Sequence, residues 1–262
     1  DLEISSWAMD YQRLSHADLR ILADTTLTIP ALTELLKSKV NKVRVAETAR
    51  AATALGQKAR SKWAAEAKED WDASPITLPR LATEVWQAIK DEDWVLSANT
   101  LEEWTRKIWD FDRPYRHPGK SLGTATQIGI SLGVALAHRD ARRLVVDLQP
   151  DGDLMFDAGA LWVAAKHRIP LLVVMYNNRA YYNDWEHQIR MAKLRGTPVE
   201  RAHIGMDMDD PAPDFAALAK SMGWYAEGPI ERPGEVAAAL KRAIAKVKAG
   251  QPALLDTITQ KR

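Results

Sequence analysis

Apolar runs that alternate with helical segments constrain the fold of this chain more than any other feature of its sequence. Residues 144–148 and 171–176 are almost entirely apolar. Strands with two apolar faces are typical of a parallel sheet covered by helices on both sides. The predicted fold is therefore an α/β fold with a parallel sheet flanked by helices on both faces. Strands are expected at residues 94–98, 143–148, 171–176, 224–226 and 253–256, and helices at 78–90, 101–109, 124–138, 157–167, 213–222 and 233–249.

Oxygen-bearing side chains follow two of the predicted strands. Asp151-Gly152-Asp153 comes after the first run and Asn177-Asn178 after the second, with room between them for one helix and two turns. Parallel strands end at the same edge of a sheet, where ligands of open α/β folds bind. Carboxylate and amide oxygens suit Mg²⁺ or Ca²⁺, and phosphate oxygens commonly complete the shell of Mg²⁺. The pattern favours a metal-anchored diphosphate, although Asp-Gly turns and Asn-Asn loops are equally common without a ligand.

Composition and missing motifs exclude several classes of protein. The 262 residues carry a formal charge of +1 and include no cysteine. A nearly neutral chain has no bulk field that favours nucleic acid or a membrane surface, and a chain without thiols has no disulfide or thiolate metal site. No apolar run approaches the roughly 20 residues that span a bilayer. Neither a signal peptide nor a P-loop or classical dinucleotide motif is visible. We expect a cytoplasmic protein.

The chain divides into three parts. Residues 1–38 are expected to be the end of a central domain, with a strand at 19–22 and a helix that has Thr28 as N-cap and Pro30 in its first turn. Residues 39–73 are rich in Ala, Lys, Arg and Glu and predict a solvated helical linker. Residues 74–262 form the α/β domain, in which 179–212 are polar and poorly patterned. Because Asp1 opens directly into a strand-like segment, we expect a fragment of a longer polypeptide.

Residues 74–262 resemble the diphosphate-binding domain of thiamine-diphosphate-dependent enzymes of the acetolactate synthase and benzoylformate decarboxylase type. The signature of that family is Gly-Asp-Gly, then a spacer of similar length, then Asn-Asn. Segments 121–129, 213–219 and 250–256 resemble the family too, and a motif pair with matching flanks is more specific than the pair alone. In this chain the signature reads Pro150-Asp151-Gly152-Asp153 and Asn177-Asn178-Arg179-Ala180.

The resemblance implies roles for the residues of the signature and its flanks. It implies that Asp151, the Asn178 side chain and the Ala180 carbonyl hold Mg²⁺, and that thiamine diphosphate supplies further oxygens. Asn99 and Thr100 match a loop that touches the diphosphate, and residues 124–128 match the segment that supports the aminopyrimidine ring. The implied cofactor-binding residues are Asn99, Thr100, Thr124, Ala125, Thr126, Gly152, Asp153, Asn178, Ala180, Tyr181 and Tyr182.

Three positions depart from the family pattern. Pro150 replaces the usual glycine and removes one backbone N–H, and Thr126 stands where a bulky residue usually lies beneath the bent cofactor. Asp153 replaces a small neutral residue and brings a carboxylate close to an anionic cofactor; we expect its side chain to cap a helix rather than bind metal.

No residue of this chain is assigned a certain catalytic role. The candidate substrate pocket consists of Tyr182, Asn183, Trp185 and His187, which follow the signature. The histidines show no metal-ligand spacing, and the acidic residues of segment 207–210 are expected to be solvated. Tyr181 and Tyr182 are candidates for the cofactor or substrate site, with packing as the equal alternative.

The resemblance implies C–C bond cleavage or formation next to a carbonyl: decarboxylation of a 2-keto acid, carboligation, or lyase action on a 2-hydroxyacyl compound. It also implies a small carbonyl substrate and a homodimer or homotetramer. In the family, a glutamate of a pyrimidine-binding domain activates the cofactor, and nothing in this chain resembles that domain. It is expected in the same longer polypeptide or in another subunit. A separate diphosphate-domain subunit of a two-chain enzyme and a non-catalytic cofactor-fold partner remain alternatives.

Overall fold

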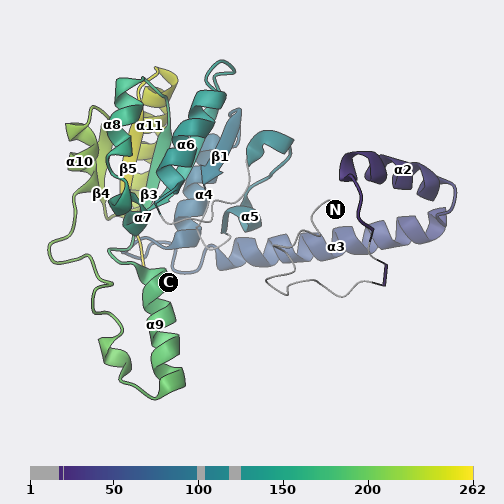
Figure 1. The fold of residues 1–262 in the computed structure, drawn as a ribbon, viewed down its shortest axis with the longest axis horizontal. Helices are drawn as coiled ribbons and strands as arrows, with labels where there is room; N and C mark the ends of the chain where they lie inside the picture. The colour runs from purple at the N-terminus through teal and green to yellow at the C-terminus, as the bar shows by residue number, and fades with distance from the viewer. Residues whose placement is uncertain (1–17, 20, 99–103, 118–124, 262) are drawn as a thin grey trace. The chain divides into compact units, whose positions relative to one another are not determined.

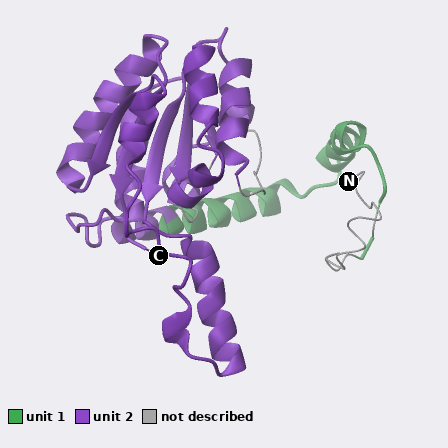
Figure 2. Cartoon of the chain, turned by 60° about the vertical axis from the view of Figure 1, so that its left-hand side comes forward, with its two compact units in different colours: residues 1–59 green, residues 60–262 purple. Residues whose placement is uncertain are grey.

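The computed structural model describes residues 18–19, 21–98, 104–117 and 125–261. The chain forms two compact units, Asp1–Ala59 and Arg60–Arg262 (Figure 2). Three of the predicted cofactor-binding residues, Asn99, Thr100 and Thr124, lie outside the described residues.

The first unit contains helix α2 (Thr25–Lys37) and the start of helix α3 (Lys42–Glu66), which continues into the second unit. The N-cap of α2 is Asp24, whose carboxylate accepts the Thr26 N–H at 2.8 Å, so the prediction of Thr28 as the cap was wrong. A carboxylate at this position also interacts favourably with the helix dipole. Pro30 consequently lies inside the helix. The described residues of segment 19–22 are not in a strand.

The second unit contains a sheet of five parallel strands in the order β1-β2-β3-β5-β4 (Figure 1). The prediction of a parallel sheet is confirmed. The strands are β1 (Trp94–Ala98), β2 (Leu144–Pro150), β3 (Leu172–Asn177), β4 (Tyr225–Ile230) and β5 (Ala253–Ile258).

Helices cover both faces of this sheet, as the apolar strands predicted. Helices α4 (Leu78–Ile89) and α11 (Val236–Lys248) pack on one face, and α6 (Gln127–Ala137), α8 (Ala160–Lys166) and α10 (Phe215–Ser221) pack on the other. Side chains alternate between the two cores along each strand, since successive residues of a strand point to opposite faces. Trp94 and Leu96 of β1 belong to the first core, and Val95 belongs to the second.

Two α-helices in the described part of this unit were not predicted. Helix α7 (Asp151–Phe156) follows β2 without a loop, and helix α9 (Tyr182–Arg195) occupies much of the stretch that seemed unpatterned. Ala192 is the only buried residue of α9, so the helix has no apolar stripe to reveal its period. Its carboxyl end does carry helix signals, namely a basic last turn and Gly196 as a left-handed C-cap. The remaining short helices are α5 (Trp104–Ile108), η1 (Pro114–Arg116), η2 (Val199–Arg201) and η3 (Pro233–Glu235).

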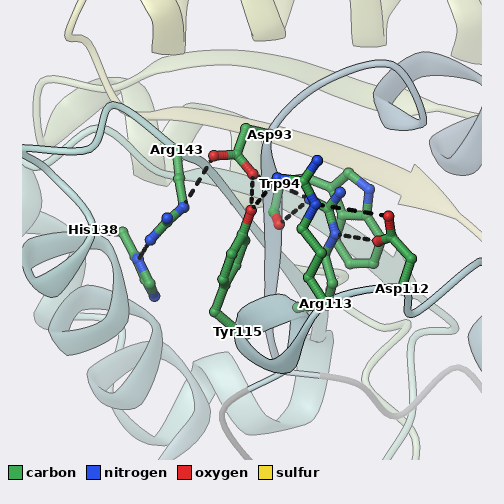
Figure 3. A network of polar contacts seen from close by, with 8 residues as sticks. Asp93, Trp94, Asp112, Arg113, Tyr115, His138 and Arg143 are labelled. Carbon is green, nitrogen blue, oxygen red and sulfur yellow. Dashed lines mark hydrogen bonds and ion pairs between the residues drawn. The ribbon is translucent and has the colours of Figure 1, made fainter.

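A polar network centred on Asp93 holds residues 112–116 against the amino end of β1 (Figure 3). Tyr115 donates a hydrogen bond of 2.6 Å to Asp93, and Arg143 donates one of 3.1 Å to the other carboxylate oxygen. The buried guanidinium of Arg116 donates to the Trp94 carbonyl at 2.8 Å and lies over the Trp94 ring. This network lies at the amino ends of the parallel strands, whereas Asp151 lies at their carboxyl ends.

Among the described residues, no helix has the length and apolar character needed to cross a bilayer.

Candidate metal and diphosphate site

The two halves of the predicted signature meet at the carboxyl edge of the sheet. Strands β2 and β3 are parallel neighbours, with Pro150 opposite Tyr176. Asp151 is the first residue of α7, directly after β2, and Asn178 directly follows β3. The oxygens of Asp151 and Asn178 are therefore presented from adjacent strand ends, as the sequence predicted.

Asp151 has a buried carboxylate, and the groups that stabilise it among the described residues are backbone N–H groups. Its side chain accepts the Ala180 N–H at 3.1 Å, and the residue is 1% exposed. Burial raises the pKa of Asp151 to about 6, and backbone N–H groups of Gly152 and Ala180 partly counteract the shift. A buried carboxylate without a cationic partner is costly to ionise. A cation next to Asp151 would favour its charged form.

The two asparagines after β3 have different roles. The Asn177 amide group donates to the buried Asp256 carboxylate at 3.0 Å, and its oxygen accepts the Arg179 N–H at 3.0 Å. Burial raises the pKa of Asp256 to about 6, and the hydrogen bond from Asn177 opposes this shift. By contrast, the Asn178 amide oxygen is buried and has no hydrogen-bond partner within the described part of the chain. Asn177 thus builds the loop, and Asn178 presents an unsatisfied oxygen.

A segment that was predicted to be only solvated holds the loop after Asn178 in place. The Tyr181 N–H donates to the Met206 carbonyl at 2.7 Å, and the Met208 N–H donates to the Arg179 carbonyl at 2.8 Å. Ala180 pairs with Asp207 in an antiparallel bridge. Asp207 itself is exposed, but its backbone supports the candidate site. Nothing in the sequence indicated this contact.

Tyr181 covers the first turn of α7. Gly152 lies against its ring so closely that a Cβ atom on residue 152 would be 2.6 Å from Tyr181 Cδ1. The ring also contacts Phe156, with centroids 5.6 Å apart. A residue with a Cβ atom at position 152 would therefore force the Tyr181 ring or α7 to shift.

The Asp153 side chain does not cap its own helix, which corrects the prediction. Its Oδ1 accepts the Ala125 N–H at 2.6 Å, and its Oδ2 accepts a hydrogen bond from the Gln149 amide at 3.2 Å. Both oxygens thus have protein partners. Thr126 lies at the N-cap of α6 but makes no side-chain cap hydrogen bond.

The contact between Gln127, which lies in the matched segment 124–128, and Asp147 was not predicted, and it fixes the start of α6. The Gln127 amide donates to Asp147 Oδ1 at 3.0 Å and to the Leu148 carbonyl at 2.5 Å. Burial raises the pKa of Asp147 to about 7, while the hydrogen bond from Gln127 lowers it. A lone acidic residue inside an apolar strand was the available sequence signal for this buried polar contact.

The predicted substrate-pocket residues all lie on the first half of α9, but only two of them pack together. The rings of Tyr182 and Trp185 are 5.7 Å apart, and the Lys261 ammonium group lies 4.5 Å from the Trp185 ring centroid. Asn183 and His187 are exposed, and the His187 ring contacts Arg190 of the same helix at 3.0 Å. The structure brings Tyr182 and Trp185 together and leaves Asn183 and His187 apart from them.

The donor set matches a hard divalent cation. No group of three or more His, Cys, Asp or Glu residues that could hold a metal occurs within the described ranges. A site built on Asp151 and the Asn178 amide oxygen therefore depends on oxygens from a ligand, which is how Mg²⁺ is commonly bound beside phosphates. The unsatisfied Asn178 oxygen and the buried Asp151 carboxylate fit such an ion.

The solved structures of two decarboxylases share the fold of this chain. The fold matches the 4-hydroxybenzoylformate decarboxylase of Rhodococcus jostii RHA1, described as thiamine diphosphate-dependent, with a TM-score of 0.57 and 23% identity over 71% of this chain and 33% of that one. It also matches benzoylformate decarboxylase from Polynucleobacter necessarius, with a TM-score of 0.56 and 18% identity over 71% of this chain and 33% of that chain. At these identities the likeness shows the fold.

A relative found by sequence has a description from the same group of enzymes. The chain is 29% identical over 136 residues to a Mycobacterium tuberculosis protein described as "Putative acetolactate synthase large subunit IlvX", which covers 52% of this chain and 25% of that protein. The chain thus spans about a quarter of this relative and a third of the solved structures. The family model for the C-terminal cofactor-binding domain of thiamine pyrophosphate enzymes matches residues 99–257. Since this match covers more than half of the sequence, the chain belongs to the thiamine pyrophosphate enzyme family and carries its C-terminal cofactor-binding domain.

Proposed function

We propose that this chain supplies the metal and diphosphate half of an active site that cleaves or forms a C–C bond next to a carbonyl group. The candidate reactions are decarboxylation of a 2-keto acid, carboligation and lyase action on a 2-hydroxyacyl compound. One observation carries the proposal: adjacent strand ends present a buried Asp151 carboxylate and a buried Asn178 oxygen that no described residue satisfies. Family membership supplies the cofactor class.

In this proposal, Asp151 and Asn178 bind Mg²⁺, together with the carbonyl of Ala180. The ion anchors the diphosphate and has no direct role toward the substrate. Gly152 lies in the first turn of α7, where helix N–H groups favour an anion. Pro150 is the N-cap and contributes no N–H, so fewer donors face the diphosphate than a glycine would allow.

Thiamine diphosphate, when bound, supplies the electron sink for the carbanion-like character that such reactions develop. The residues of this chain bind the cofactor and orient it. The ring of Tyr181 covers the first turn of α7, where Asp151 is buried. The loop after β3 is tied to residues 206–208 by backbone hydrogen bonds, which keeps Ala180 beside Asp151.

The pyrimidine-binding domain with its activating glutamate is the proposed partner, in the same longer polypeptide or in another subunit. Two observations support a missing partner. The chain spans only a third of the solved structures that it matches. Helices α6, α7 and α8 are in contact beside the candidate site, and together they expose a set of large apolar side chains, as expected of a covered surface. These side chains are Ile130, Leu136, Met155, Phe156, Trp162 and Val163.

We also propose that the complete protein is a homodimer or a homotetramer.

Calorimetric titration of thiamine diphosphate into the complete assembly, with and without Mg²⁺, tests the proposal. Binding is expected only with Mg²⁺, and Asp151→Ala should abolish it. Asp209→Ala is a matched control, because Asp209 is an exposed acidic residue that directly follows segment 206–208. Absence of binding by the wild-type assembly would favour a non-catalytic partner with a cofactor fold.

Native mass spectrometry of the complete protein distinguishes a single long polypeptide from a two-chain enzyme.

A further inference from the structure

Ala125 has a backbone conformation that alanine disfavours. Its φ is +68°, in the left-handed region, and it lies two residues before the start of α6. A residue with a Cβ atom adopts this region only at an energetic cost, because its Cβ comes too close to the neighbouring carbonyl oxygen. Such a conformation persists only where its surroundings hold it.

The Asp153 carboxylate provides the interaction that holds it. Oδ1 of Asp153 accepts the Ala125 N–H at 2.6 Å, across 28 residues of sequence. Oδ2 accepts the Gln149 amide at 3.2 Å, which orients the carboxylate from the neighbouring strand β2. Hydrogen bonds to an ionised acceptor are stronger than those between neutral groups.

We propose that Asp153 is a positioning residue, which clamps the strained backbone of Ala125 to helix α7. This inference rests on the proposed function, in which α7 faces the diphosphate and residues 125–126 lie near the pyrimidine end of the cofactor. The clamp would fix the distance between these two segments before the cofactor binds. It also accounts for a carboxylate next to an anion site, because both oxygens are directed to protein donors.

Gln127 makes the clamp a two-point attachment. Two residues beyond Ala125, its amide donates to Asp147 and to the Leu148 carbonyl. The start of α6 is therefore tied to β2 by Gln127 and to α7 by Asp153. Loss of Asp153 should free Ala125 and leave α6 itself in place.

Three substitutions in the complete protein test the clamp. Asp153→Ala removes the acceptor, Asp153→Asn keeps an oxygen acceptor without the charge, and Ala125→Gly lowers the cost of the left-handed conformation. Asp157→Ala is the matched control, because Asp157 is an exposed acidic residue at the other end of α7. Hydrogen exchange of the Ala125 amide is measured without cofactor, and thiamine diphosphate binding is measured with Mg²⁺.

Asp153→Ala is expected to speed exchange at Ala125 and to weaken cofactor binding, each by about tenfold, the size of one lost charge-assisted hydrogen bond. Asp153→Asn and the double variant Ala125→Gly/Asp153→Ala should recover much of the binding. The clamp is overturned if Asp153→Ala leaves exchange unchanged, or if Asp153→Ala and Asp153→Asn both tighten binding, as simple charge repulsion predicts. If the wild-type protein binds no cofactor, the proposed function is wrong, and the exchange measurement alone still decides whether the clamp exists.

Discussion

The carboxylate of Asp151 accepts a hydrogen bond of 3.1 Å from the backbone N–H of Ala180, which lies 29 residues later in the chain. This contact joins the ends of β2 and β3 at the candidate metal site. The Asn178 amide oxygen remains buried and unsatisfied by the described residues. The site is thus assembled by the protein, with one oxygen left for a ligand.

Alanine substitutions of the two adjacent asparagines should differ in their effect on the free energy of unfolding. Asn177→Ala removes the donor to the buried Asp256, and a buried group that loses its partner costs about 1–3 kcal/mol of the free energy of unfolding. Asn178→Ala removes an unsatisfied oxygen, so the stability of the cofactor-free protein should stay within about 0.5 kcal/mol of the wild type. Urea unfolding measures both effects.

In calorimetric titration, Asn178→Ala should lose Mg²⁺-dependent binding of thiamine diphosphate although its fold is intact. If Asn178→Ala binds the cofactor as the wild type does, Asn178 is not a metal ligand.

Gly152→Ala should move Tyr181. The added Cβ atom would be 2.6 Å from the ring, so the side chain or α7 must shift, at a cost of about 1–3 kcal/mol in thermal or urea unfolding. Gly234→Ala is the control, because no atom lies within 4 Å of its added Cβ. Replacing Tyr181 with alanine in the Gly152→Ala background should restore most of the lost stability. Failure of this double variant to recover would place the strain elsewhere.

The cofactor-free protein should lose stability between pH 5 and pH 8, partly because of Asp147. Burial raises the pKa of Asp147 to about 7, whereas the unfolded chain ionises near the ordinary value of 3.8. The folded state therefore binds more protons than the unfolded state in this range. Its free energy of unfolding falls as pH rises, by at most about 1.4 kcal/mol per pH unit for this group.

Asp147→Asn should flatten that slope and stabilise the protein at pH 8, since Asn can still accept the hydrogen bond from Gln127. Urea unfolding at several pH values measures the slope for both proteins. Equal slopes in wild type and variant would show that Asp147 is already ionised at pH 5.

Arg116→Ala should destabilise the protein at the amino end of strand β1. The buried guanidinium donates to the Trp94 carbonyl and packs over the Trp94 ring (Figure 3). Loss of this hydrogen bond and this packing should cost about 2 kcal/mol in urea unfolding. Arg113→Ala, which removes a largely exposed arginine of the same segment, should cost less than about 0.5 kcal/mol. Cofactor affinity should stay unchanged in both variants, because this edge is opposite to Asp151.

The sequence by itself determined the parallel sheet, the helices on its two faces and the placement of Asp151 and Asn178 at neighbouring strand ends. These features depend on local periodicity and on the rule that parallel strands end at one edge. The short helix α7 and the polar helix α9 could not be predicted from the sequence, because neither has an apolar stripe long enough to display the helical period.

Only the tertiary structure decided which polar groups are satisfied. Asp153 reaches Ala125 across 28 residues, and Asn177 reaches Asp256 across 79. Such partners depend on strand register and on how a helix packs against the sheet, and neither quantity is encoded in the spacing of a motif. The different roles of Asn177 and Asn178 have the same cause. The fold brings Asp256 beside the Asn177 amide group, and it leaves the Asn178 oxygen buried without a donor from the residues that the structure describes.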